Sequence, residues 1–306
     1  MSLHSEIKEH LSGPIPSLST PFTATGAIDY NSIANMLEFY IESGLRSIML
    51  TAGDSHYLCL SDREIAELTE FVLHTTRKRL FVIAADRYFS TGAAAEFASS
   101  IKSSGADLLM LMPPTWGNSV TSESLAAHYA EIAKIMPVMI VTNIFATNQS
   151  MGLETILRAT EISENVVAVK DDITGAFCRK LAMSLDGRLA LVSGGQKQNH
   201  LDVFPYGSCG YLSTFARFYP QIAKRYWDSI EHSDIASASA IIKGIDAPYF
   251  NTIFPMRGGF DSGIHGTLEL FGLAKRFRRK PYTTIGDDEM DTLREFFRSK
   301  IKIPLR

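Results

Sequence analysis

An alternation of short apolar runs with amphipathic stretches recurs eight times along the chain and restricts the fold more than any other feature. The runs are rich in Val, Ile, Leu and Met, and most are apolar on both faces, as parallel strands buried on both sides are. They cover residues 15–22, 47–53, 80–86, 107–113, 138–143, 166–172, 189–195 and 210–216. Helical patterns follow them near residues 30–43, 61–77, 91–104, 121–135, 152–160, 175–184, 197–205 and 219–232.

Eight successive strand–helix units with short connections predict an α/β fold of the (β/α)₈ type, a TIM barrel. A doubly wound sheet is the alternative, but its Gly-x-Gly-x-x-Gly motif after the first strand is absent from the sequence. Further helical patterns without strands occupy residues 233–247, 266–277 and 287–299. We therefore expect a barrel over residues 1–232 and a C-terminal helical extension over residues 233–306 that packs on it.

Local signals support several of these boundaries. Ser61, followed three residues later by Glu64, fits a capping box at a helix start. Gly44, Gly105 and Gly187 follow helical patterns, where a left-handed residue commonly ends a helix.

Composition excludes several classes of protein. The 30 Lys and Arg against 33 Asp and Glu give a net charge of −3, which argues against a nucleic-acid-binding protein with a basic footprint. Apolar stretches stay shorter than the ~20 residues of a membrane span, and the polar start lacks the core of a signal peptide. Cys59, Cys178 and Cys209 are too few for a disulfide framework, and the eight histidines lack metal-ligand spacing. We expect a cytoplasmic protein without a bound metal.

Barrel enzymes carry their active sites at the carboxyl ends of the strands, which yields a short list of candidate residues. At these ends the sequence places Thr51, Ala52, Gly53, Asp54, Ser55, Arg87, Trp116, Thr142, Lys170, Gly194 and Ser213.

Lys170 is the most informative of these candidates because it ends the apolar run that begins at Val166. Desolvation at such a strand end favours the neutral amine, which can attack a carbonyl and form a Schiff base. The alternative is a structural ion pair with Asp171 or Asp172. Position alone does not separate the two interpretations.

The other candidates also have two interpretations each. Thr51 and Ser55 either bind a carboxylate or cap the following helix, and Asp54 can likewise interact with the amides of a helix start. Arg87 is either an anion clamp or a surface ion-pair partner. Trp116 is either a ligand platform or part of the packing.

Taken together, the segments resemble the dihydrodipicolinate synthase/N-acetylneuraminate lyase family of class I aldolases and lyases, from Gly13 to about Phe297. Residues 51–55, Thr-Ala-Gly-Asp-Ser, resemble the Gly-Thr-Thr-Gly-Glu-Ser loop of the family, and residues 166–171 resemble the strand that bears its Schiff-base lysine. The opening strand, the last strand with its loop and a C-terminal helix are matched by residues 13–22, 207–220 and 268–273.

This resemblance implies a (β/α)₈ barrel that condenses or cleaves 2-keto acids without a cofactor other than the covalent imine. Lys170 would attack the ketone of pyruvate or a related keto acid, and the loop of residues 51–55 would hold the substrate carboxylate. The family is often tetrameric, so the resemblance also implies a homotetramer or homodimer.

The sequence departs from the family at the groups that move protons and bind carboxylates. Thr142 stands where the resemblance expects a proton-shuttling tyrosine, Thr115 and Trp116 replace a tyrosine pair, and Thr147 lies near the place of an arginine. Loss of an acid–base group costs about 10²–10⁴-fold in rate unless it is replaced. Arg87 is our candidate for a substitute anion site.

Three functions therefore stay open. The first is a Schiff-base lyase or aldolase acting on an altered keto acid or keto-sugar acid. The second is dihydrodipicolinate synthase activity with pyruvate and aspartate semialdehyde. The third is a non-catalytic relative that binds a keto acid or a partner protein.

Overall fold

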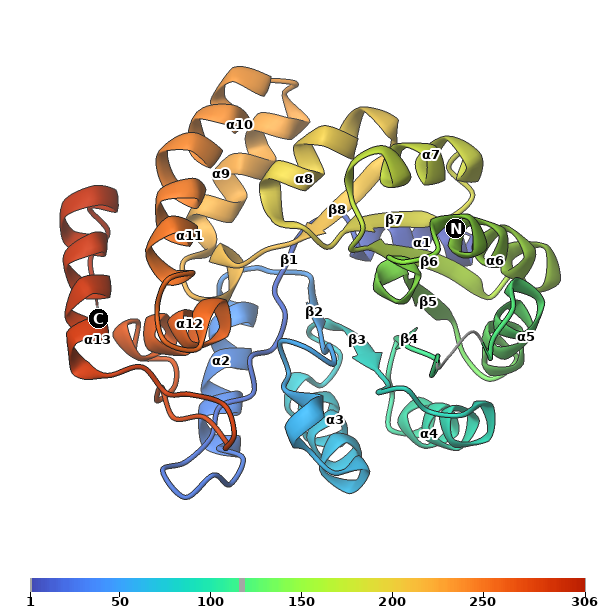
Figure 1. Cartoon of the computed structure of the whole chain (residues 1–306), viewed down its shortest axis with the longest axis horizontal. Coiled ribbons are helices and arrows are strands. Elements are labelled where there is room, and N and C mark those ends of the chain that lie inside the picture. The colour runs from blue at the N-terminus through green and yellow to red at the C-terminus, as the bar shows by residue number, and fades with distance from the viewer. Residues whose placement is uncertain (1, 116–118, 306) are drawn as a thin grey trace.

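The computed structural model, which describes residues 2–115 and 119–305, contains one parallel eight-stranded sheet that curls into a barrel with helices around it (Figure 1). The strand order is β1-β8-β7-β6-β5-β4-β3-β2, so the predicted (β/α)₈ barrel is confirmed. The strands are β1 (Gly13–Ile15), β2 (Ser47–Met49), β3 (Phe81–Ala85), β4 (Leu108–Leu111), β5 (Val138–Val141), β6 (Val166–Asp171), β7 (Ala190–Ser193) and β8 (Ser208–Leu212).

Helices surround the barrel and continue beyond it to the C-terminus. Those that accompany the strands are α1 (Leu3–His10), α2 (Tyr30–Glu42), α3 (Asp62–Thr76), α4 (Thr91–Ser103), α5 (Ser122–Ala133), α6 (Gln149–Ile162), α7 (Gly175–Leu185), α8 (Gln196–Val203) and α9 (Pro220–Glu231). The C-terminal helices are α10 (Ile235–Ile241), α11 (Ala247–Ile253), α12 (Gly259–Leu270) and α13 (Asp287–Glu295).

The barrel closes between β1 and β2 by a short seam. Leu18 N donates to Met49 O at 2.9 Å, and Met49 N donates to Pro16 O at 3.0 Å. Because Pro14 and Pro16 have no N–H to donate, β1 is much shorter than the apolar run 15–22 that predicted it. The residues after β1 stay buried as an irregular segment.

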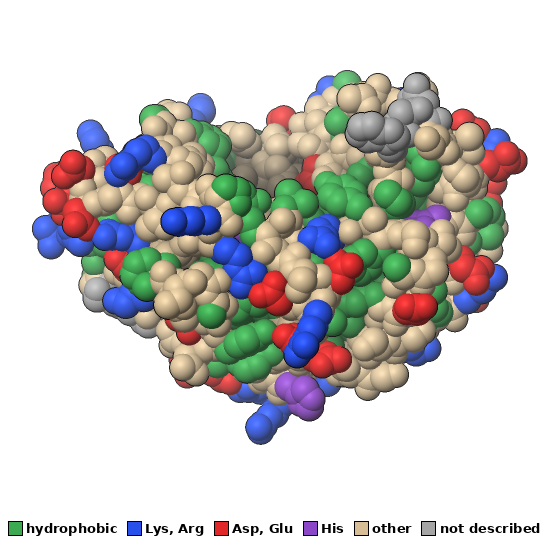
Figure 2. Space-filling model, turned by 60° about the horizontal axis from the view of Figure 1, so that its bottom comes forward, with side chains coloured by type: hydrophobic (Ala, Val, Ile, Leu, Met, Phe, Trp, Pro, Cys, Tyr) green, Lys and Arg blue, Asp and Glu red, His purple; other side chains and the backbone are tan. Residues whose placement is uncertain are grey.

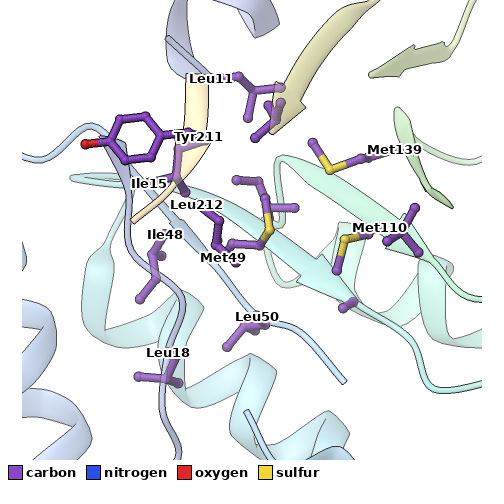
Figure 3. Packing of buried hydrophobic residues seen from close by; sticks show 14 of the residues in the cluster. Leu11, Ile15, Leu18, Ile48, Met49, Leu50, Met110, Met139, Tyr211 and Leu212 are labelled. Atoms are coloured by element: carbon purple, nitrogen blue, oxygen red, sulfur yellow. The ribbon is translucent and has the colours of Figure 1, made fainter. Parts of the chain in front are cut away.

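Methionine and leucine side chains fill the interior of the barrel. Met49, Met110 and Met139 come from three different strands and are each 1% exposed or less. Figure 3 shows them pointing inward beside Leu212 of β8. The flexible thioethers suit the irregular space left by the short first strands.

Helix α1 covers the amino-terminal end of the barrel near β6 and β7 and was not predicted from the sequence. Its buried residue is Ile7, and Leu11 follows it into the core. The His4 ring lies 2.9 Å from Arg188 O and 2.7 Å from Glu164 O, which fixes the helix to the loops before β7 and β6.

The helix predicted over residues 233–247 continues to Ile253 as α10, a π-helical turn at Ile242–Asp246, and α11. Pro248 in the first turn of α11 cannot donate to a carbonyl four residues before it, and the wider π turn absorbs this lost hydrogen bond. A proline that normally ends a helix therefore lies inside a continuous one.

The helix predicted over residues 266–277 is wrong in its bounds, because α12 spans Gly259–Leu270. The glycines of α12 allow close packing. A Cβ on Gly263 would lie 2.5 Å from Ile253 Cβ, and one on Gly266 would lie 2.3 Å from Ile285 Cδ1. The helix ends before Gly272, which has a φ of +70°.

An aromatic cluster joins the C-terminal helices to the barrel. The ring of Phe218, just before α9, lies 5.6 Å from that of Tyr249 and 5.2 Å from that of Phe271, and Phe297 lies 5.2 Å from Phe271. The helical extension after residue 232 thus packs on the barrel, and its division from the barrel at that residue stays a prediction.

The predicted local signals are present. Ser61 and Glu64 form a capping box at the start of α3. Gly44, Gly105 and Gly187 have φ values of +67°, +96° and +74° after α2, α4 and α7. These caps place the following strands within a few residues of each helix end.

The surface carries both signs of charge. On the face shown in Figure 2, Lys and Arg side chains are interspersed with Asp and Glu side chains. Within residues 2–115 and 119–305, none of the helices combines the length and apolar character of a transmembrane span.

Close approach of β8 to the start of β1 predicts a severe effect of Gly210→Ala. A Cβ at this position would lie 2.0 Å from Leu11 O, so the backbone would have to move. We expect the free energy of unfolding to fall by about 1–3 kcal/mol or more, as in other overpacked cores, measured by urea unfolding.

Gly92→Ala in α4 is the matched control, because a Cβ there meets nothing within 4 Å. It should leave stability unchanged or raise it by up to about 1 kcal/mol. Equal stabilities for the two variants would contradict the close approach at Gly210.

Candidate active site

A cavity of about 330 Å³ lies at the carboxyl ends of the strands, where barrel enzymes carry their active sites. Its apolar lining includes Met110 and Leu212, which also belong to the barrel core. The lining residues are Thr51, Ala52, Gly53, Asp54, Leu58, Tyr88, Met110, Met112, Val141, Asn143, Lys170, Asp172, Gly194, Gln196, Leu212, Arg217 and Phe260.

Lys170 reaches this cavity from β6, between Val141 of β5 and Val192 of β7. It is 5% exposed. Its Nζ lies 2.5 and 2.6 Å from the two carboxylate oxygens of Asp172. The ion pair that the sequence left open is therefore present, and it involves Asp172. It lies at the cavity wall, since both residues also line the cavity.

Gly194 makes room for that carboxylate. A Cβ at this position would lie 1.7 Å from Asp172 Oδ1 and 3.0 Å from Asp171 O. The predicted site residue Gly194 follows β7, and because it has no side chain, the Asp172 carboxylate can approach Lys170.

Thr142 lies just behind the cavity and is not among its lining residues. Its Oγ1 donates to Asp171 Oδ1 at 2.8 Å and accepts from Asp172 N at 2.9 Å. Asp171 in turn accepts from Thr174 N at 2.8 Å. Thr142 thus orders the turn after β6, and its hydroxyl is occupied with the neighbouring aspartates.

The loop of residues 51–55 turns back on itself at the cavity wall. Thr51 Oγ1 accepts from Asp54 N at 3.0 Å, and Ser55 Oγ accepts from Thr51 N at 3.1 Å. Within the described part of the chain, the backbone N–H groups of Ala52 and Gly53 have no hydrogen-bond partner. Two adjacent free amides at a cavity wall can bind an anion.

Ser55 is a structural member of this loop. Its Oγ donates to Leu18 O at 2.7 Å, and Thr20 Oγ1 donates to Ser55 O at 2.7 Å. The helix that follows, α3, is capped by Ser61, so the helix-capping role considered for Thr51, Ser55 and Asp54 is not what these residues do.

Arg217 is a charged lining residue that the sequence reasoning missed. Its guanidinium Nη2 lies 2.5 Å from Asp54 Oδ2, and Nη1 donates to Ser19 Oγ at 3.1 Å. The residue is 1% exposed, and its Nε is buried without a partner among the described residues. A signal existed in the sequence, because Arg217 directly follows the apolar run 210–216, as Lys170 ends its own run.

The environment keeps Asp54 ionised. Burial alone would raise the pKa of this carboxyl, but the charge of Arg217, the hydrogen bond from Ser17 (2.5 Å) and the charge of Lys170 together lower it. The Arg217–Asp54 pair therefore stays charged and joins the loop ends that follow β1, β2 and β8.

Two neutral histidines lie behind this pair. His56 Nε2 and His265 Nε2 are 2.7 Å apart, and both rings are buried. Burial, followed by the charge of Arg278, lowers the pKa of His56 to about 3, although Asp54 opposes the shift. Burial also holds the pKa of His265 well below its usual range. Neither ring adds positive charge to the site near neutral pH.

Besides Thr142 and Ser55, the predicted site residues Arg87 and Ser213 are not among the residues that line the cavity. Arg87 Nη1 donates to Tyr57 O at 2.9 Å and Leu60 O at 2.7 Å, and its other terminus pairs with Asp62. Ser213 Oγ accepts from Ala216 N at 3.3 Å within the turn after β8. Trp116 lies outside the described residues.

Asp86 directly follows β3 and is fully buried. Its Oδ1 accepts from Met112 N at 2.6 Å, while its Oδ2 is buried without a partner in the described residues. Burial raises the pKa of Asp86 to about 7, because the two backbone hydrogen bonds offset only part of the desolvation.

Comparisons with known proteins agree with this geometry. Residues 10–300 match the model of the dihydrodipicolinate synthetase family. The chain is 28% identical over 246 residues to the 4-hydroxy-tetrahydrodipicolinate synthase of Psychrobacter sp. (strain PRwf-1), covering 79% of this chain and 80% of the relative.

Solved structures show the same likeness. The dihydrodipicolinate synthase of Acinetobacter baumannii, complexed with pyruvate, has a TM-score of 0.79 at 25% identity and covers 96% of this chain and all of its own. The N-acetylneuraminate lyase of Fusobacterium nucleatum has a TM-score of 0.84 at 16% identity, covering 95% and 99% of the two chains. The second likeness shows the fold alone.

The buried Asp86 makes a prediction for stability against pH. An unfolded carboxyl titrates near ~4, so between about pH 4 and 7 the unfolded chain releases a proton that the folded chain keeps. Asp86 therefore lowers the free energy of unfolding as pH rises through this window, by ~4 kcal/mol at ~1.4 kcal/mol per unit. Asp86→Asn should remove that loss.

Urea unfolding at pH 5 and pH 8 measures this effect, and the variant should gain stability over the original chain at pH 8 more than at pH 5. Asp202→Asn, at an exposed position, is the control and should show no such pH-dependent difference. A gain from Asp86→Asn that is the same at both pH values would refute the raised pKa.

Proposed function

The chain belongs to the dihydrodipicolinate synthetase family of Schiff-base lyases and aldolases, and on this basis we propose that it condenses or cleaves a small 2-keto acid, such as pyruvate, through an imine on Lys170. The family uses a lysine imine and no separate cofactor. The observation that supports Lys170 as this lysine is its position: its side chain is 7% exposed, and the residue lines the cavity near the end of β6.

The chemistry requires a neutral amine beside a bound ketone. Lys170 Nζ attacks the ketone carbon, water leaves, and the protonated imine withdraws electrons from the adjacent carbon. Loss of a proton or cleavage of a carbon–carbon bond at that carbon then gives an enamine, which a second substrate or a proton can trap. The apolar wall formed by Met110, Val141 and Leu212 limits water around this step.

The substrate carboxylate has a receptor in the loop of residues 51–55. The free N–H groups of Ala52 and Gly53 are donors for an anion, and the Thr51 hydroxyl, which accepts from Asp54 N, still has its own proton to donate. Asp54 does not contact the anion in this proposal; it holds the loop in place through Arg217.

The size and charge of the cavity favour a small substrate. A volume of about 330 Å³ is at the lower end for ligand pockets, and each of the two cations in its lining is already paired with a carboxylate. We therefore propose pyruvate or a short 2-keto acid, with an aldehyde partner that includes aspartate semialdehyde and the aldehydes derived from keto-sugar acids.

Assembly and location are further parts of the proposal. Leu58 is 60% exposed and Tyr88 is 43% exposed, and both lie at the cavity wall. Exposed apolar side chains beside a cavity favour cover by a second copy, as in a homodimer or homotetramer. The three cysteines are free thiols, which favours the reducing cytoplasm.

Borohydride reduction in the presence of pyruvate tests the imine. We expect mass spectrometry to find a reduced pyruvate adduct on Lys170, because borohydride converts the imine to a secondary amine that does not hydrolyse. Lys170→Arg should give no adduct while keeping a cation beside Asp172. Lys134→Arg, at an exposed lysine, is the matched control and should react like the original chain.

A panel of 2-keto acids and keto-sugar acids extends this test to the alternatives. Absence of a Lys170 adduct with every member would refute the proposal and leave a relative that binds without catalysis. If pyruvate does form the adduct, an assay with aspartate semialdehyde decides between dihydrodipicolinate synthesis and another aldol reaction.

A further inference from the structure

We propose that Asp172 is the acid–base catalyst for imine formation on Lys170. This proposal rests on Lys170 forming the imine and names the group that moves its protons. Asp172 touches the reacting atom directly, since both of its carboxylate oxygens lie within 2.6 Å of Nζ.

Among the described residues, the carboxylates that line the cavity are those of Asp54 and Asp172. The Asp54 carboxylate is already occupied by an ion pair and a hydrogen bond. Asp54 binds Arg217 Nη2 at 2.5 Å and accepts from Ser17 Oγ at 2.5 Å. Asp172 has Lys170 as its ion-pair partner, and its side chain is 25% exposed toward the cavity. It is thus the carboxylate that can exchange protons with both the amine and a bound ketone.

The surrounding structure holds Asp172 in this position. Its backbone N–H donates to Thr142 Oγ1 at 2.9 Å, and Thr142 donates in turn to Asp171 Oδ1 at 2.8 Å. Gly194 leaves the space for its carboxylate, because a Cβ there would lie 1.7 Å from Oδ1. Thr142 and Gly194 are therefore positioning residues for this catalyst.

The proton transfers balance with no further reactant. The Lys170 ammonium first gives a proton to the Asp172 carboxylate, and the resulting amine attacks the ketone carbon. The former ketone oxygen takes that proton from Asp172 and becomes a hydroxyl group. Nζ then gives a second proton to the Asp172 carboxylate. The nitrogen lone pair expels the hydroxyl group, which leaves as water with this second proton. The products are a protonated imine, one water and the Asp172 carboxylate.

Asp172→Asn tests the proposal in the full-length chain, because the amide keeps the shape of the side chain and removes its basicity. The readout is the rate at which pyruvate and borohydride label Lys170. We expect the rate near pH 7 to fall ~10²–10⁴-fold, the usual worth of a general acid–base group. The variant rate should rise steeply with pH, as free amine becomes available, while the original chain keeps a flatter profile.

Chemical rescue separates catalysis from a structural role. Asp172→Gly leaves space beside Lys170, and added acetate should restore part of the labelling rate in proportion to its concentration. Gly194→Ala should also slow labelling, because its Cβ displaces the carboxylate. Thr142→Val should slow labelling less and change its pH profile, and Thr142→Ser, which keeps the hydroxyl, should restore both.

Asp186→Asn is the matched control, since it removes the charge of an exposed aspartate at the end of α7, and its labelling should be unchanged. Equal rates and equal pH profiles for Asp172→Asn and the original chain would overturn the assignment of Asp172. Absence of any Lys170 adduct in the original chain would instead refute the proposed function. The two failures are therefore distinguishable.

Discussion

Closure of the barrel between β1 and β2 is the constraint on which the site depends. Parallel strands normally meet through a continuous ladder, but the prolines around Ile15 remove donors, and only a short seam reaches Met49 in the described chain. Side chains supply the connections that the backbone lacks. Arg217 reaches from the end of β8 to Ser19 and Asp54, so one buried guanidinium joins the ends of three neighbouring strands.

This seam also shapes the loop of residues 51–55, the proposed receptor for the substrate carboxylate. Asp54 is held from two sides, by Arg217 and by Ser17, and its backbone N–H in turn fixes Thr51. Ala52 and Gly53 line the cavity, and their backbone N–H groups have no partner in the described chain. Because both lining cations are paired, the proposed carboxylate site relies on backbone dipoles, and a chain with a net charge of −3 needs no basic surface to bind a small anion.

The barrel and Lys170 could be predicted because both follow from local patterns. Alternating strands and helices leave few architectures, and a lysine that ends a buried run must lie at the mouth of a barrel. Arg217 satisfies the same rule, because it directly follows the run 210–216, yet Arg87 was chosen as the candidate anion site. The guanidinium of Arg87 donates hydrogen bonds to the carbonyls of Tyr57 and Leu60, a tertiary contact that the sequence pattern does not indicate. The bounds of helix α12 were also predicted wrongly. Its glycines Gly263 and Gly266 pack against side chains that lie ten or more residues away in the sequence.

Thr142, which stands where the resemblance implies a phenol, is consistent with the side chains that surround it. A threonine hydroxyl is a poor acid–base group, but it can bridge Asp171 and the backbone of Asp172 at 2.8 and 2.9 Å. That bridge positions the Asp172 carboxylate only if there is space for it beside Lys170, and the missing side chain of Gly194 leaves that space. Any one of these residues alone would be unfavourable: an aspartate without the glycine would clash, and a lysine buried without the aspartate would lose its counter-charge. The positions of Thr142, Asp172 and Gly194 therefore depend on one another. In the proposed mechanism, the reactivity of Lys170 depends on all three.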